Sequence, residues 1–130
     1  MTKLITFDEL EEMLMDIAFE LPDDLFRGLN GGVFLLPGGK LHPESSEPGG
    51  LFILGEYHHE PRGLGRYITV YYGSFVRVYG GYDPARQKEF LKKIVFHEFT
   101  HHLESLAGEK ELEIKDALDI MRYKKKNNRP

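Results

Sequence analysis

Histidine and glutamate stand at a spacing that suits metal-assisted hydrolysis in the segment His-Glu-Phe-Thr-His-His, residues 97–102. A helix turns about 100° per residue, so His97 and His101 lie on one face, one turn apart. Each can direct an imidazole nitrogen at a single zinc ion. Glu98 lies beside them and is a candidate general base toward a zinc-bound water. The H-E-x-x-H segment therefore predicts a hydrolytic site with Zn²⁺ as its cofactor.

The flanking sequence predicts a helix that carries this motif from about Pro84 to Ala107. Apolar side chains recur at helical spacing through residues 90–106. Asp83 suits the N-cap, Pro84 suits the first helical position, and Gly108 suits the residue just past a helix end. The two histidines should therefore be presented by a rigid, regular element.

Length and composition indicate one globular domain. We expect a single domain over residues 1–130, with a frayed basic tail at 122–130. The chain is 41% hydrophobic and contains nine Phe and seven Tyr, enough for a real core. It has no cysteine, which excludes disulfides and thiolate metal ligands. Any zinc must therefore be held by histidine and carboxylate.

Charge and hydropathy restrict the possible partners. The net charge of −4 does not suggest non-specific binding to nucleic acid. No apolar run is long enough to span a bilayer, and the N-terminal segment does not look like a signal peptide. We expect a cytoplasmic enzyme of bacterial type, without nucleic-acid or membrane partners. The sequence does not define an oligomeric state.

The remaining elements predict an α+β fold. Thr6 and Glu9 form a capping-box pattern ahead of an amphipathic helix from about Phe7 to Leu21. Strands are predicted at 33–36, 51–57 and 67–72, and Phe75–Tyr79 either continues the last strand or forms another. Residues 37–50 and 58–66 are expected to be loops, and apolar residues after Gly108 predict a final helix. The order indicates a small, mostly antiparallel sheet packed on the long motif helix, with N-terminal and C-terminal helices.

A third zinc ligand is expected from beyond the turn at Gly108. Hydrolytic zinc sites usually have three protein ligands and one open position. If the last helix folds back, the ligand should lie about as far beyond Gly108 as His101 lies before it. Asp116 is therefore the favoured ligand and Glu113 the alternative, with Glu111 suitable only if the chain is extended there.

Other polar residues near the motif have two interpretations each. Glu104 lies on the same helix face and either orients His101 by a hydrogen bond or is a solvated carboxylate. His102 points about 100° away from His101 and is interpreted as a packed or hydrogen-bonded residue rather than a ligand. The other histidines are interpreted as loop residues on the surface: His42, His58 and His59.

With these features in view, the chain resembles the minimal zincin-like metallopeptidases, small stand-alone domains found widely in bacteria. The resemblance covers nearly the whole chain, from the acidic helix over 7–21, through Arg66–Tyr71, to the H-E-x-x-H helix. It implies a zincin-like fold, with a small sheet over the active-site helix and zinc held by the two motif histidines. It also implies hydrolysis of peptide bonds in a peptide or protein substrate, with Glu98 as the base.

The chain departs from that family after the motif. Many members follow the pattern H-E-x-x-H-x-x-G-x-x-D, in which the aspartate is the third ligand. Here Glu104 stands in place of the glycine and Ala107 in place of the aspartate. The two histidines and Glu98 therefore carry over from the resemblance, and the third ligand does not.

Three further expectations concern function. A substrate strand is expected to pair with a sheet edge near Tyr67–Tyr72. Tyr71 and Tyr72 are interpreted chiefly as packing residues, with an oxyanion hydrogen bond as the alternative. A non-catalytic binding module on a zincin scaffold remains open. A carboxylate-bridged dimetal protein is less favoured, because Glu98-x-x-His101 is only half of that motif.

Overall fold

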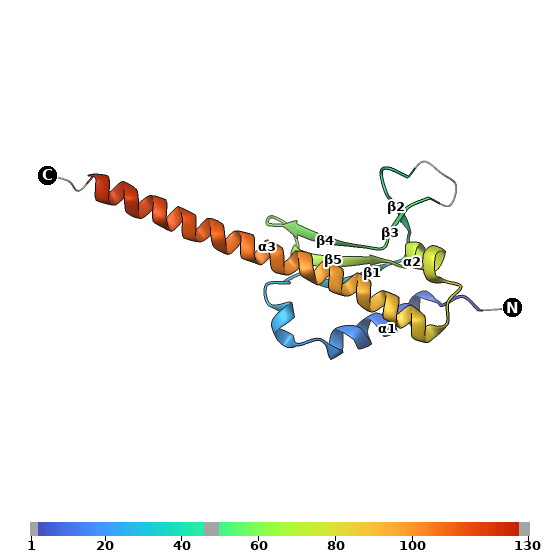
Figure 1. Ribbon diagram of the computed structural model, residues 1–130. Coiled ribbons are helices and arrows are strands. Elements are labelled where there is room, and N and C mark those ends of the chain that lie inside the picture. The colour runs from blue at the N-terminus through green and yellow to red at the C-terminus, as the bar shows by residue number, and fades with distance from the viewer. Residues whose placement is uncertain (1–2, 46–49, 128–130) are drawn as a thin grey trace.

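Helices and strands are combined in an α+β arrangement (Figure 1). The structure, a computed structural model, describes residues 3–45 and 50–127, without the side chains of residues 113, 114 and 121–127. The helices are α1 (Phe7–Glu20), the short 3-10 helix η1 (Asp23–Phe26), α2 (Tyr72–Tyr79) and α3 (Pro84–Asn127). The strands are β1 (Gly32–Leu36), β2 (Lys40–Leu41), β3 (Phe52–Ile53), β4 (Gly55–Glu60) and β5 (Gly65–Tyr71). The predicted α+β class is confirmed.

The main sheet has three strands in the order β1–β5–β4. β1 runs parallel to β5 and β4 runs antiparallel to it, so this sheet is mixed and not mostly antiparallel as predicted. β2 and β3 form a separate antiparallel pair. The strand predicted at 67–72 is confirmed as β5, but β5 is central. The expectation that a substrate strand pairs beside Tyr67–Tyr72 is therefore wrong, because both sides of β5 are already occupied.

α1 begins as the sequence predicts. Thr6 Oγ1 accepts a hydrogen bond from the N–H of Glu9, and Glu9 Oε1 accepts one from the N–H of Thr6, both at 3.1 Å. This reciprocal capping box satisfies two amide donors that a helix start would otherwise leave unpaired. The helix thus starts at a defined residue and presents its apolar side to the sheet and α3.

α1 and α3 cover one face of the main sheet and enclose the core. Ile68 and Val70 of β5 are fully buried on that face. The helices contribute most of the other buried side chains: Leu10, Leu14, Ile17, Phe75, Leu91, Ile94, Val95 and Phe99. α3 therefore has one face in the core, and its remaining surface is available for a site.

The chain turns into a helix where a strand was expected. Phe75–Tyr79 belongs to α2, so the prediction of a further strand there is wrong. The N–H of Gly73 bonds to the carbonyl of Gly38 at 3.0 Å, and a Cβ on Gly73 would lie 2.5 Å from the amide nitrogen of Gly39. This close backbone crossing coincides with the end of β5. Short apolar runs do not distinguish strand from helix, which is why the sequence misled us.

α3 is one continuous helix of 44 residues, so the predicted turn at Ala107–Gly108 and the separate final helix are wrong. Arg66 of β5 donates to Ser105 Oγ at 3.3 Å and pairs with Glu109 at 2.6 Å. These contacts hold both sides of Gly108 against the sheet. A glycine inside a helix costs only about 1 kcal/mol relative to alanine.

Beyond this contact, α3 extends well past the rest of the molecule (Figure 1). It continues to Asn127, into the segment we expected to be frayed. Within the described part of the chain, no helix is both long enough and apolar enough to cross a membrane.

Candidate metal centre

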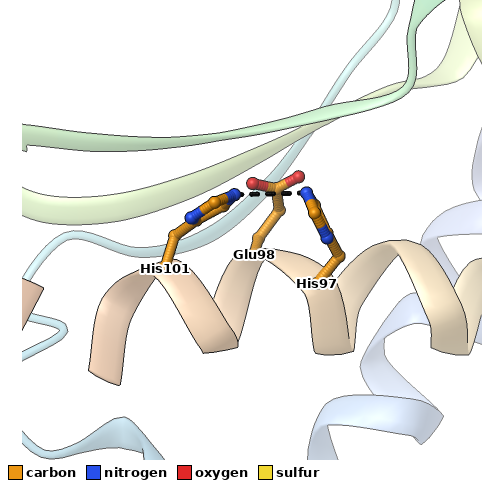
Figure 2. A group of neighbouring side chains, drawn as sticks. All are labelled: His97, Glu98 and His101. Carbon is orange, nitrogen blue, oxygen red and sulfur yellow. Dashed lines mark hydrogen bonds between the residues drawn. The ribbon is translucent and has the colours of Figure 1, made fainter. Parts of the chain in front are cut away.

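His97, Glu98 and His101 lie together on one turn of α3, as the sequence predicts. Figure 2 shows all three side chains rising from the helix toward the strands of the sheet. The Nε2 atoms of the two histidines are 3.1 Å apart, and their ring planes stand at 85°. Both histidines are exposed, whereas Glu98 is buried. The helix alone therefore brings the three groups together.

The donor atoms fit a zinc ion. Two nitrogens bound to tetrahedral zinc at about 2.0–2.1 Å stand roughly 3.3 Å from each other. The observed Nε2 separation of 3.1 Å needs little adjustment to reach that value. One ligand atom from each of His97, Glu98 and His101 lies within 4.8 Å of the other two. The two histidine nitrogens are ligands that zinc uses; with Glu98 kept as the candidate base, the described residues place no third protein ligand beside them.

Glu98 is the buried member of the group. Burial raises the pKa of its carboxyl group, because removal from water disfavours the charged form. The positive charge that His97 and His101 can carry opposes this effect, yet the net shift is upward. A carboxyl group with a raised pKa, held beside two imidazoles, is suited to accept a proton and release it again.

Glu104 approaches the outer nitrogen of one histidine. Its Oε2 lies 3.5 Å from Nδ1 of His101, and its side chain is 67% exposed. A carboxylate in this position favours the tautomer in which Nδ1 carries the proton. Nε2 is then the unprotonated nitrogen and faces His97. The pair meets no hydrogen-bond geometry and Glu104 is largely exposed, so its orienting role stays a prediction.

β4 forms the opposite wall of the site. Gly55, Glu56 and Tyr57 line a hollow of about 490 Å³ together with His97, Glu98 and His101. A larger hollow of about 880 Å³ lies between α1 and the first turn of α3, and its lining includes none of these six residues. We assign function to the smaller hollow because it contains the group of side chains that can bind a metal.

The outer edge of β4 is available for pairing. The N–H of Tyr71 bonds to the carbonyl of Leu54, and the pairing register alternates from there. The backbone groups of Gly55, Tyr57 and His59 therefore point away from β5. Among the described residues, β4 has a neighbouring strand on one side only. Sequence reasoning missed this edge, because strand order depends on contacts distant along the chain.

Gly55 allows β4 to pass close to α3. A Cβ at this position would lie 3.0 Å from Cγ2 of Ile94 and 3.4 Å from Cγ of Glu98. Any side chain would therefore press on Ile94 and on the Thr69 carbonyl, at 3.2 Å, and would touch Glu98. A glycine inside the strand predicted at 51–57 was the only sequence signal for this close approach.

Glu56 belongs to a charged network that the sequence did not predict. Lys40 Nζ and the hydroxyl of Tyr71 each donate to Glu56 Oε1 at 2.6 Å. Burial raises the pKa of the Glu56 carboxyl, but these two hydrogen bonds outweigh it and the pKa is lowered overall. Glu56 therefore stays ionised beside the hollow.

Glu56 also begins a second Glu-x-x-His segment, ending at His59, which the dimetal hypothesis requires. The segment lies in strand β4, where side chains three positions apart face opposite sides. Among the described residues, the group that can bind a metal comprises only His97, Glu98 and His101. The arrangement therefore gives the dimetal hypothesis no support.

The other histidines are engaged elsewhere. His102 is fully buried and hydrogen-bonded, which confirms its interpretation as a structural residue. His58 was expected in a loop but belongs to β4, which extends to Glu60. The Nε2 atom of His58 lies 2.9 Å from Thr69 Oγ1. His42 Nδ1 accepts from the N–H of Glu44 at 3.1 Å. His59 is exposed near the end of β4.

The structure does not bring the predicted third ligand to the histidines. Asp116 lies fifteen residues beyond His101 on the same straight helix, which is about 22 Å along the axis. Glu113 is about 18 Å along the axis from His101, and its side chain lies outside the described residues. The prediction of Asp116 depended on a turn at Gly108 that α3 does not make.

Tyr71, the last residue of β5, and Tyr72, the first of α2, have structural partners. The Tyr72 hydroxyl donates to the carbonyl of Ile5 at 2.6 Å, and the Tyr71 hydroxyl donates to Glu56. These contacts agree with the packing interpretation and leave neither hydroxyl aimed at His97 or His101.

One solved structure is closely similar to this chain. It is a conserved hypothetical protein from Thermus thermophilus, 36% identical in sequence, with a TM-score of 0.67. The match covers 80% of the present chain and 99% of that protein. No protein-family model and no curated protein matches the chain. Identity at this level over nearly the whole relative shows common ancestry, and the chain belongs to the same family as the T. thermophilus protein.

Proposed function

We propose that the protein is a zinc-dependent metallopeptidase with a zincin-like fold. The observation that carries this proposal is the facing pair of histidine Nε2 atoms, 3.1 Å apart, beside the buried carboxyl of Glu98. A helix carrying H-E-x-x-H beneath a small sheet with a free edge supports the zincin-like assignment. His97 and His101 would hold the zinc ion.

The chain's own residues divide the hydrolytic work. Zinc, when bound, supplies a Lewis acid and a water whose pKa is lowered toward neutrality. Glu98 accepts the proton of the attacking water and returns it to the leaving amine. Its burial keeps the carboxyl close to both imidazoles and away from competing solvent. Glu104 holds His101 in the tautomer that leaves Nε2 free.

The free edge of β4 offers a place for the substrate. Gly55 and Tyr57 direct backbone N–H and C=O groups outward and also line the hollow above His97 and His101. An extended peptide that pairs with this edge would lie across the metal-binding histidines. Backbone pairing binds peptides with little regard to their side chains. The substrate class is therefore an extended segment of a peptide or protein.

The test is a cleavage assay on the full chain loaded with one equivalent of zinc. A mixed peptide library, read by mass spectrometry, should show new termini that are absent from a chelator-treated sample. Glu98→Gln is the matched control, because it keeps the size of the side chain and both histidines but cannot accept the proton. Its zinc content should be unchanged and its cleavage lost.

Two outcomes would count against the proposal. Zinc-loaded protein that cleaves nothing would leave a non-catalytic metal-binding module on this fold. Cleavage that survives in Glu98→Gln would mean that another protease is present or that Glu98 is not the base.

A further inference from the structure

His102 is a buried polar residue that the proposed chemistry does not use. It follows His101 directly, but it points into the protein and is fully buried. Its ring lies 5.4 Å from that of Tyr57 and 6.4 Å from that of Phe99, measured between centroids. A polar side chain in such a place must have its hydrogen bonds satisfied by fixed partners.

The hydrogen bonds of His102 define its protonation. Nε2 lies 2.8 Å from the carbonyl oxygen of Arg27, which can only accept, so Nε2 carries the proton and donates it. Nδ1 is therefore the bare nitrogen, and it accepts from the hydroxyl of Tyr57 at 2.8 Å. With both nitrogens engaged, His102 is a cross-link between three segments: the zinc-binding turn of α3, β4, and the residue after η1.

This cross-link joins the two walls of the site. Tyr57 belongs to β4, whose outer backbone groups form the free edge, and it lines the same hollow as His97 and His101. Gly55, two residues earlier, passes close to Ile94 and Glu98 of α3. The bond from Tyr57 to His102 therefore attaches the edge strand to the helix turn that carries the metal ligands.

We propose that Tyr57 and His102 are positioning residues that hold the free edge of β4 at a fixed height above His97 and His101. Their consequence for catalysis rests on the proposed peptidase function, whereas their effect on β4 does not. The pair needs no contact with metal or substrate. It acts by keeping the strand that receives the substrate in register with the groups that cleave it.

The primary test is amide hydrogen exchange, measured by mass spectrometry on the full chain with Tyr57→Phe. This change removes one hydroxyl and leaves the ring in place. The matched control is Tyr72→Phe, which removes a tyrosine hydroxyl that donates to a backbone carbonyl at 2.6 Å in another part of the protein. The control has no contact with β4 that involves the lost hydroxyl.

We expect peptides covering β4 and Arg27–Leu29 to exchange about tenfold faster in Tyr57→Phe, because a buried nitrogen of His102 loses its donor. The β5 amides that donate to β4 should also exchange faster, exchange in α1 should be unchanged, and Tyr72→Phe should leave β4 unchanged. Unaltered exchange in β4, or a uniform rise over the whole chain, would overturn the proposal. These readouts require no enzymatic activity.

The catalytic consequence is tested with zinc-loaded protein. Tyr57→Phe should keep the wild-type zinc affinity, because both histidines belong to α3, while kcat/KM for a cleaved peptide falls about tenfold. Faster exchange in β4 without loss of kcat/KM would overturn the positioning role. If the wild type cleaves no peptide, the proposed function fails, and the exchange experiment still decides whether the pair anchors β4.

Discussion

Zinc affinity distinguishes a straight α3 from a helix that folds back at Gly108. The perturbations are Glu104→Ala and Asp116→Ala, each removing one carboxylate from the same helix. Glu104 Oε2 lies 3.5 Å from Nδ1 of His101. Asp116 is about 22 Å along the axis from His101. Only the first variant should weaken zinc binding.

The expected magnitudes follow from these positions. Removing a group that orients a histidine ligand typically costs about 10- to 100-fold in metal affinity. Glu104 is 67% exposed, so solvent weakens its effect and we expect the lower end. A tenfold loss corresponds to about 1.4 kcal/mol. Asp116 lies more than two screening lengths away at physiological salt, where that length is about 8 Å. Its removal should change the affinity by less than about twofold.

The assay is a competition titration against a chromophoric zinc chelator, with circular dichroism to confirm that helix content is retained. His101→Ala provides the control for loss of a direct ligand. If Asp116→Ala loses zinc and Glu104→Ala does not, the reasoning from a continuous α3 is refuted. The C-terminal segment would then reach the histidines in solution.

Three further predictions concern α3, β4 and the charged network. Gly108→Ala should raise the free energy of unfolding by about 0.5–1 kcal/mol in urea denaturation, because Gly108 is helical with open space around its Cβ position; destabilisation would indicate a left-handed residue ending the helix. Gly55→Val should lower the free energy of unfolding by about 1–3 kcal/mol, because the new side chain would contact Ile94 and Glu98. An unchanged melting temperature would contradict the close approach of β4 to α3. Because the pKa of Glu56 is lowered, ionised Glu56 should stabilise the folded protein above pH 4.5, the ordinary pKa of the group. That stabilisation should be lost as the pH falls below 4.5. The stability gap between wild type and Glu56→Gln, measured in denaturant from pH 7 to pH 3, should therefore narrow in acid, and a constant gap would contradict this assignment.

The parts of the fold that follow from local chemistry could be predicted from the sequence. The capping box at Thr6 and Glu9 is an interaction between neighbours, and it forms as expected. The apolar spacing around the motif predicts α3, and helical geometry alone brings His97 and His101 together. Glu98 is adjacent to them, so its place in the site also follows from the sequence.

The failures lie where distant residues decide the outcome. The helix continues past Gly108, and Arg66, some forty residues earlier in the chain, binds on both sides of that glycine. No local signal at Ala107 or Gly108 records this contact. The third-ligand prediction failed with the turn. The central position of β5 likewise depends on its pairing with β1, and β2, β3 and β4 separate these two strands in the sequence.

The packed part of α3 and its projecting C-terminal part differ in how they can unfold. As far as His102, α3 has buried residues in the core while its exposed face carries the metal-site histidines, so this part is held by the rest of the domain. Beyond Glu109, the helix extends away from the rest of the chain (Figure 1). Most helix stability in proteins comes from packing against other elements, so a segment that extends away from the rest of the chain is less stable than the packed part. The projecting part can therefore fray and re-form as an independent local unit. The Arg66–Glu109 ion pair marks the boundary at which such fraying stops, two turns beyond His101. The histidine pair thus keeps its geometry whether or not the end of its own helix is folded.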